Sequence, residues 1–393
     1  MKHNPKNQRP NSFKRRAAAV VMVAVTLPVL LGVAALTVDV AYLYNIRGDL
    51  QRSADAGALA GASALTGDAM MQVRMGNGGS ALSDLELTVE DRSIMFSGLN
   101  PTLGTSTTVI TAGEITLGWL DMSLATASVQ TSGAPSDYNA VQVLTRRTAD
   151  SANGPIDLLF AQVFGLTISE ASASATAAFD DRMAGFDTSS YPGGLLPFTI
   201  EQNVFDLDFA SGPDQYTFDS GTDTVSTGSD GIREIKLYPY DTAPGNFGLL
   251  NIGTPNQGVP ALQDHIENGV PPEDFEAEVG TAVLTFYDDD GNSTTYQITG
   301  NPGLKVALQS SIETQIGNVV GFFLHNAVTG TGANAVYTIT EIRFGRLMDV
   351  QLQGPPSGRG LWVQPVSFSG SGVNVAASAP SSGGLVGRMV IAR

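Results

Sequence analysis

The longest apolar pattern in the chain runs from Ala17 to Val38 and contains no charged residue. Its 22 residues, at about 1.5 Å of rise per residue, are enough for a helix to cross a hydrocarbon core of about 30 Å. Pro28 and Gly32 interrupt the run, and membrane helices tolerate both residue types. The pattern predicts a transmembrane anchor over residues 17–44.

The segment in front of this run is basic. Six of the 21 basic residues precede Ala17, with no acidic residue among them: Lys2, Lys6, Arg9, Lys14, Arg15 and Arg16. The positive-inside rule predicts that residues 1–16 form a cytoplasmic tail and that the bulk of a single-pass inner-membrane protein lies outside the cytoplasm. A cleaved signal peptide is the alternative. The anchor is favoured because an h-region has only about 7–15 residues, and Ala-x-Ala matches such as 58–60 fall in a helical pattern.

Asp39 follows the apolar run at its outer end. We expect this side chain to be interfacial and solvated. The functional alternative is a pairing with a basic residue of a partner helix, since an acid within a bilayer usually has a role. In that case Asp39→Ala would weaken co-purification with other assembly proteins.

The helical pattern continues beyond the membrane. Apolar residues recur at every fourth position: Tyr42, Ile46, Leu50, Ala54, Ala58 and Ala62. Gly57 and Gly61 add a face of small residues, which lets another backbone approach closely. Packing against the sheet of the same chain is the favoured interpretation, and packing against a partner helix is the alternative.

Residues 45–180 are predicted to form an α+β unit. Alternating apolar positions predict strands at 85–89, 115–117 and 141–143, and small residues alternate with hydroxyl residues over 169–178. Pro155–Phe164 is predicted to be a short helix that Gly165 ends. The expected architecture is a long helix on an antiparallel sheet, which is pilin-like by analogy of fold alone.

Asp180–Gly194 is rich in Asp, Gly, Ser and Pro, so a domain boundary is predicted there. Residues 190–393 are predicted to form a β-rich extracytoplasmic domain. Its expected strands are 232–238, 282–287, 294–298, 336–344 and 361–368, with a last strand after Leu385, and its expected helices are 260–268 and 304–316.

Charge and composition exclude several functions. The chain carries 21 basic and 38 acidic residues, and past Tyr44 the balance is 15 to 37. An acidic exterior repels nucleic acid, so no nucleic-acid partner is expected. The chain has no Cys, which excludes disulfides, thiolate zinc sites and thiol nucleophiles.

The sequence Asp288-Asp-Asp-Gly-Asn292 is the one candidate for a metal site. Asp288, Asp290 and Asn292 resemble the start of a calcium loop, but Thr299 stands where such a loop needs a bidentate Glu. The flanking residues are typical of strands, so a β-hairpin turn is favoured, with Asp-Gly supplying positive φ. A weak calcium site is the alternative.

Catalysis is not expected. Besides His3 in the basic tail, only His265, expected on a helix surface, and His325 could serve a Ser-His-Asp triad. The chain has no Gly-x-Ser-x-Gly sequence and no phosphate-binding Gly-x-x-x-x-Gly-Lys loop. We therefore expect no enzyme, no cofactor and no small-molecule substrate.

One ordered set of features is typical of a known family. The apolar helix with its Pro and Gly is followed by Val38-Asp39, an aromatic pair at Tyr42 and Tyr44, Arg47, Leu50-Gln51 and Ala-Asp-Ala at 54–56. Over residues 14–66 the chain resembles TadG-like proteins of the Flp (Tad) pilus-assembly system. Weaker similarity follows at 115–121, 139–147, 154–165, 244–253 and 330–339. Asp121-Met-Ser123-Leu-Ala125 lacks the last Ser of the metal motif that some relatives carry, so that site is not transferred.

The resemblance implies a non-enzymatic, membrane-anchored component of pilus assembly or of a secretion apparatus. Its partners would be pilus or secretion-apparatus proteins, and the membrane itself. The alternative is a membrane-tethered or secreted binding module or adhesin that carries the same anchor.

Overall fold

The structure is a computed structural model that describes residues 12–102, 109–123, 128–191, 193–239, 245–253, 258–355 and 358–392. The chain forms two compact units. The first consists of Met1–Ala54, Ser97–Ile110 and Leu144–Ser174, and the second of Asp55–Phe96, Thr111–Val143 and Ala175–Arg393. The predicted boundaries at 45–180 and 190–393 stay a prediction.

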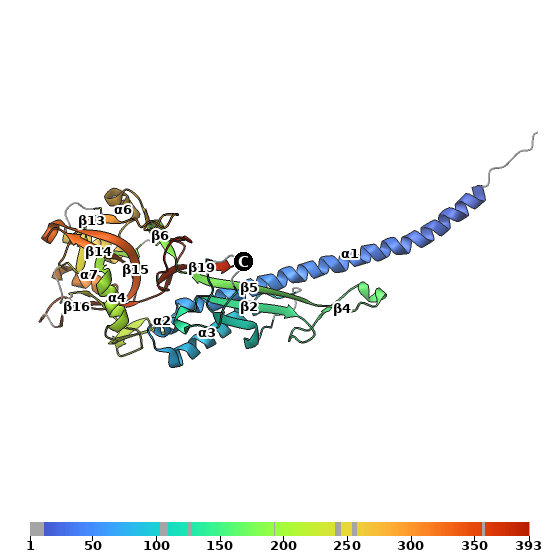
Figure 1. Cartoon of the computed structure of the whole chain (residues 1–393), viewed down its shortest axis with the longest axis horizontal. Coiled ribbons are helices and arrows are strands. Elements are labelled where there is room, and N and C mark those ends of the chain that lie inside the picture. The colour runs from blue at the N-terminus through green and yellow to red at the C-terminus, as the bar shows by residue number, and fades with distance from the viewer. Residues whose placement is uncertain are drawn as a thin grey trace, which may run out of the picture. The chain divides into compact units, whose positions relative to one another are not determined.

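Helix α1 (Ser12–Ala62) is a single helix of 51 residues that continues through Pro28 (Figure 1). Its apolar side chains between Val20 and Val40 are exposed, and by length and composition it can span a membrane. Farther along, the predicted fourfold pattern is confirmed: the side chains of Ile46, Leu50, Ala54, Ala58 and Ala62 are fully buried. The first half of α1 is therefore apolar and exposed, and its second half packs against the rest of the protein.

Residues 85–89 are helical, so the strand predicted there is wrong. They belong to α3 (Gly78–Gly98), which follows the short α2 (Asp68–Arg74). Leu85 and Val89 are buried, whereas Leu87 is 59% exposed. Five buried residues repeat at every fourth position: Ala81, Leu85, Val89, Ser93 and Ser97. Three alternating apolar residues are too few to distinguish the period of a strand from that of a helix. Only the longer repeat from Ala81 to Ser97 identifies the helix.

In the first unit, Pro155–Phe164 is not the predicted helix. The segment contains β3 (Ile156–Asp157) and the 3-10 turn η4 (Ala161–Phe164), and β3 pairs with β4 (Ile168–Ser169) in an antiparallel hairpin. Gly165 ends the turn as predicted, at φ +81°. Ile156 and Ala171 pack with Ile46 and Leu50 of α1 in a small apolar core.

The predicted α+β architecture is confirmed by a five-stranded sheet in the order β1-β2-β5-β19-β17. Its strands are β1 (Ile115–Gly118), β2 (Ala140–Arg147), β5 (Ala171–Asp180), β19 (Val386–Ala392) and β17 (Phe368–Ser369). β1 pairs with β2 in antiparallel fashion, with Ile115 opposite Val143. β19, the predicted last strand, pairs with β5, with Met389 opposite Phe179. The carboxyl-terminal strand thus extends the sheet that residues 115–180 begin.

A seven-stranded sheet forms the core of the second unit, in the order β10-β16-β15-β13-β11-β7-β14. Because β14 pairs with both β7 and β15, five of these strands close into a ring. In chain order the strands are β7 (Leu195–Glu201), β10 (Ile235–Tyr238), β11 (Phe247–Leu250), β13 (Tyr296–Asn301), β14 (Val319–Thr329), β15 (Ala335–Gln351) and β16 (Gly360–Pro365). Among the described residues, this core contains ten buried Phe and Tyr side chains, including Phe322, Phe323 and Tyr337.

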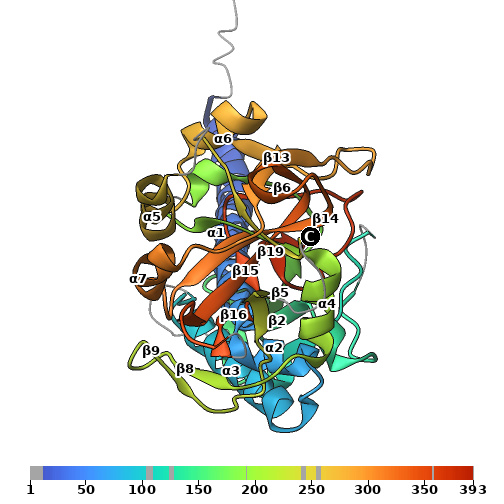
Figure 2. The same cartoon turned by 90° about the vertical axis from the view of Figure 1, so that its left-hand side faces the viewer.

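Four helices lie around these strands (Figure 2): α4 (Gln202–Ser211), α5 (Val259–Asn268), α6 (Pro272–Val279) and α7 (Gln309–Glu313). Helix α5 confirms the prediction for 260–268, but the helix predicted over 304–316 is split into the turn η6 (Val306–Leu308) and α7. The segment 180–194 contains a strand that its composition concealed, β6 (Met183–Asp187), which lies between β12 (Val283–Thr285) and β18 (Val373–Val375). A separate hairpin joins β8 (Tyr216–Asp219) to β9 (Thr224–Thr227).

Candidate functional site

The Asp39 side chain of α1 is buried, with 2% of its surface exposed, so the expectation of a solvated side chain is wrong. Its carboxylate accepts hydrogen bonds from three consecutive backbone N–H groups. Oδ1 lies 2.9 Å from the nitrogen of Leu159 and 3.2 Å from that of Phe160. Oδ2 lies 3.0 Å from the nitrogen of Phe160 and 2.6 Å from that of Ala161. Asp39 therefore fastens the tip of the β3–β4 hairpin to α1.

Gly32 marks a second contact between α1 and this hairpin. A Cβ atom at Gly32 would lie 3.3 Å from Cζ of Phe164, which is tighter than an ordinary van der Waals contact. Beside this contact lies an open apolar hollow of about 540 Å³, which Pro28, Val29 and Leu36 of α1 also line. The predicted anchor residues Pro28, Gly32 and Asp39 are thus brought together with one loop.

Gly61 packs inside the chain, as the favoured interpretation of the small-residue face predicted. A Cβ atom there would lie 2.2 Å from Oγ of Ser93 in α3 and 3.0 Å from Cγ1 of Val141 in β2. Gly57 is buried as well. Small residues on this face of α1 let α3 and the sheet approach the helix backbone.

The sequence Asp288–Asn292 forms a turn. Tyr287 bridges Ser293 in antiparallel fashion, and Gly291 has φ +82°. Oδ1 of Asp288 accepts hydrogen bonds from the backbone N–H groups of Asp290 and Asn292 at 3.0 and 2.8 Å, and Oδ2 accepts one from the side-chain amide of Asn292 at 2.9 Å. These donors hold the pKa of Asp288 below its usual value. The carboxylate of Asp288 therefore stabilises the turn. The calcium site, which is the alternative, stays a prediction.

Both histidines of the second unit have structural partners. His265 is buried rather than on a helix surface, which corrects the expectation, and its Nε2 lies 2.9 Å from Oδ2 of Asp274. His325 is buried between Thr199, whose Oγ1 lies 2.9 Å from Nδ1, and the carbonyl of Gly245. Burial lowers the pKa of His325 to about 4, so the ring is neutral at ordinary pH. In the described part of the chain, no serine hydroxyl hydrogen-bonds to either ring.

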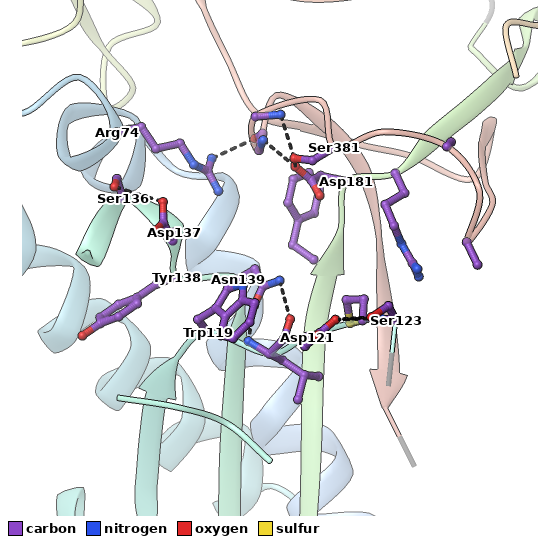
Figure 3. A pocket seen from close by; sticks show the side chains of 18 residues that line it. Arg74, Trp119, Asp121, Ser123, Ser136, Asp137, Tyr138, Asn139, Asp181 and Ser381 are labelled. Atoms are coloured by element: carbon purple, nitrogen blue, oxygen red, sulfur yellow. Dashed lines mark hydrogen bonds between the residues drawn. The ribbon is translucent and has the colours of Figure 1, made fainter. Parts of the chain in front are cut away.

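A polar cavity of about 410 Å³ in the second unit is the remaining candidate (Figure 3). Its charged groups are paired within the chain. Asp121 Oδ1 accepts hydrogen bonds from the backbone N–H and the hydroxyl of Ser123, which lowers the pKa of Asp121. Asp181 accepts one from the backbone N–H of Gly384, whose carbonyl accepts one from Arg74. Burial lowers the pKa of Arg74 to about 10, which leaves it charged.

The described lining of the cavity offers shape and polarity. Asp121 is hydrogen-bonded to Ser123, and no histidine is among the described residues of the wall. Among the described residues, no group of three or more His, Asp or Glu side chains is placed to hold a metal ion. The most distinctive site is therefore the contact of α1 with the β3–β4 hairpin.

Sequence reasoning missed the hairpin tip. Its signal was present, because Leu158–Ser169 contains no charged residue within an acidic chain. The segment was predicted to be a short helix, whereas in the structure it forms a hairpin tip on which Leu159, Phe160 and Val163 are 55%, 45% and 85% exposed.

Two family models match parts of the chain. Residues 17–64 match the family model described as "Putative Flp pilus-assembly TadE/G-like", and residues 84–177 match the one described as "Putative Tad-like Flp pilus-assembly". No curated protein and no solved structure matches significantly. The resemblance of this chain to TadG-like proteins of Flp pilus assembly is confirmed, and the first match falls on α1.

Proposed function

We propose that the protein is a membrane-anchored, non-catalytic component of the Flp (Tad) pilus-assembly or secretion apparatus. The observation that carries the proposal is the family match over residues 17–64. It falls on a helix whose large apolar side chains are exposed between Val20 and Val40, and whose every fourth side chain from Ile46 to Ala62 is buried. A helix of this kind joins a membrane to a folded body.

The anchor sets the orientation. The basic residues before Ala17 stay in the cytoplasm, and the residues after the membrane-spanning part of α1 lie outside it. The acidic exported part then acts through contacts with pilus subunits or other envelope proteins. Support for contact rather than catalysis comes from the family match and from the pairing of the titratable groups around the polar cavity.

The assembly role is tested by deletion and complementation. Deleting the gene is expected to reduce surface pili or secretion, and the wild-type gene is expected to restore them. Normal piliation in the deletion strain would contradict the role. Biotin labelling of intact cells separates the adhesin alternative, because an adhesin must reach the cell surface.

The anchor and its orientation are tested with cysteine variants, for which this cysteine-free chain is suited. Ser12→Cys lies in front of the apolar run, and Ser226→Cys lies at an exposed position of β9. In spheroplasts, a membrane-impermeant maleimide is expected to label position 226 at once and position 12 only after lysis. The reverse pattern would overturn the orientation.

Cleavage of the amino terminus is tested by mass spectrometry of the protein from a membrane fraction. Recovery of the peptide that contains Lys14–Arg16 would support the anchor. A mature chain that begins after Val38 would mean a released protein, and the secreted binding module would then be the better proposal.

A further inference from the structure

The tip of the β3–β4 hairpin is an unusual surface for a protein that is otherwise acidic. Six apolar side chains gather on it, and each has between 45% and 85% of its surface exposed: Leu159, Phe160, Val163, Phe164, Leu166 and Ile168. A contiguous exposed patch of this kind marks a contact with another apolar phase. Charged side chains stand only at the base of the hairpin, where Asp157 and Glu170 are exposed.

The tip lies against the part of α1 that is predicted to cross the membrane. Phe164 contacts Gly32, and the apolar hollow beside them is lined by Pro28, Gly32 and Leu36 on α1 and by Ala161, Phe164 and Leu166 on the loop. Gly32 is seven residues from Asp39, which corresponds to about 10 Å along the helix axis. Figure 1 shows the hairpin, beside the label β4, extending along α1.

Seven backbone N–H groups of Leu158–Ile168 have an acceptor. The carboxylate of Asp39 accepts hydrogen bonds from the backbone N–H groups of Leu159, Phe160 and Ala161. The N–H groups of Leu158, Val163, Gly165 and Leu166 donate to carbonyls of the same loop, at 2.9 to 3.2 Å. The amide of Gln162 donates to the carbonyl of Leu158 at 2.6 Å. Irregular backbone that faces lipid does not enter the hydrocarbon core, so a loop of this kind can reach the boundary between headgroups and acyl chains, where the paired N–H groups lower the cost of leaving water.

We propose that Leu158–Ile168 is a second membrane-contacting element, whose exposed apolar side chains enter the boundary between headgroups and acyl chains beside α1, in the leaflet on the side of the exported residues. The occupant of the patch and of the hollow is lipid hydrocarbon, because the surface is continuous with the exposed apolar side chains of α1. Asp39 is the positioning residue that holds the loop at this depth. The inference rests on the proposed membrane anchoring of α1.

A protein that contacts the membrane through both a helix and a loop is more restricted in its orientation than one held by a helix alone. A lone helix can rotate about its axis and tilt, whereas an inserted loop beside it restricts both motions. The loop would therefore give the exported part of this chain a preferred orientation toward the membrane surface.

Depth-dependent fluorescence quenching tests the insertion. The variants Val163→Cys, Leu30→Cys and Ser226→Cys each carry one cysteine at a position where the native side chain is exposed. Each is labelled with an environment-sensitive nitrobenzoxadiazole dye and reconstituted into vesicles of phosphatidylethanolamine and phosphatidylglycerol, with or without bromine on the acyl chains. Brominated lipid is expected to quench the labels at 163 and 30, with blue-shifted emission, and to leave the label at 226 unchanged.

Other outcomes separate this inference from the proposed function. A quenched label at 30 with an unquenched, red-shifted label at 163 would overturn the inserted loop and leave the anchor intact. A label at 163 that is blue-shifted but unquenched, and that changes with the protein-to-lipid ratio, would overturn lipid in favour of a protein occupant. An unquenched label at 30 would overturn the anchor itself.

Discussion

Oδ2 of Asp39 accepts a 2.6 Å hydrogen bond from the backbone N–H of Ala161, which lies 122 residues farther along the chain. The bond joins the outer end of the apolar run in α1 to the tip of the β3–β4 hairpin. A buried carboxylate that receives several N–H donors holds their backbone in one conformation, because the donors have no other partner nearby.

Asp39→Ala is expected to release the hairpin tip from α1. Three N–H groups lose their acceptor, so the loop must open to find other partners. Hydrogen exchange measured by mass spectrometry on the reconstituted protein should show faster exchange at residues 159–161. Asp39→Asn is the matched control, since it keeps one acceptor oxygen and should retain part of the protection. Unchanged exchange in Asp39→Ala would contradict the fastening role.

Gly61→Ala is expected to lower the free energy of unfolding by about 1–3 kcal/mol, because the added methyl group overpacks the contact with Ser93 and Val141. Gly48→Ala is the control in the same helix. Nothing lies within 4 Å of a Cβ atom there, so the better helix former should stabilise by up to about 1 kcal/mol. Denaturant titration in detergent measures both changes.

The Gly61 prediction has a second-site test. Oγ of Ser93 is buried and, among the described residues, has no hydrogen-bond partner. Ser93→Ala removes the nearest clashing atom, so it should restore much of the stability that Gly61→Ala loses. A double-mutant cycle with purely additive effects would show that the two side chains do not meet.

Glu234 is expected to make the stability of the second unit depend on pH. Its side chain is fully buried, and burial raises its pKa to about 7, although the backbone N–H groups of Gln215 and Tyr216 donate to it. Because the folded pKa lies above the ordinary value of 4.5, folding favours the protonated form. The contribution to stability is present below about pH 4.5 and is lost as the pH rises to about 7.

Melting temperatures measured between pH 5 and pH 8 test this dependence. Glu234→Gln stays neutral, so its stability should change less over this interval than that of the wild type. Glu276→Gln, at an exposed position of α6, is the control and should keep the wild-type dependence. Parallel pH curves for the wild type and Glu234→Gln would count against the raised pKa.

The turn at Asp288 is expected to fold without calcium, because its carboxylate already accepts three hydrogen bonds from Asp290 and Asn292. Adding EGTA should leave the melting temperature unchanged, whereas Asp288→Ala should lower it with or without calcium. A calcium-dependent rise in melting temperature that Asp290→Ala abolishes would instead establish the calcium site.

Long periodic patterns in the sequence determined the main elements. The uncharged run from Ala17 and the fourfold repeat from Ile46 to Ala62 predicted one helix with an exposed half and a buried half, which α1 confirms. Such long patterns are reliable because a long segment can satisfy only one period of burial. The short alternations at 115–117 and 141–143 also agree with β1 and β2, whereas the equally short one at 85–89 falls in a helix.

Tertiary contacts decided the segments whose local signals were short. Residues 85–89 fit a strand and a helix equally well until the buried positions of the whole of α3 were known. Pro155–Phe164 satisfies the local rules for a helix. In the structure, however, β3 pairs with β4, and Asp39 accepts hydrogen bonds from the backbone N–H groups of Leu159, Phe160 and Ala161. A prediction from neighbouring residues includes neither the distant carboxylate nor the partner strand, so it could not identify the hairpin.

The sequence by itself determined the long apolar helix, the buried fourfold repeat that follows it and the β-rich character of the second half. Only the tertiary structure decided that β19 pairs with β5, that β14 joins β7 to β15, and that the apolar residues of the hairpin tip face outward. Local propensity and periodicity depend on neighbours in the chain. The pairing of β19 with β5, the pairing of β14 with β7 and the burial of Asp39 depend on groups more than a hundred residues away, and their energies exist only once the chain has folded.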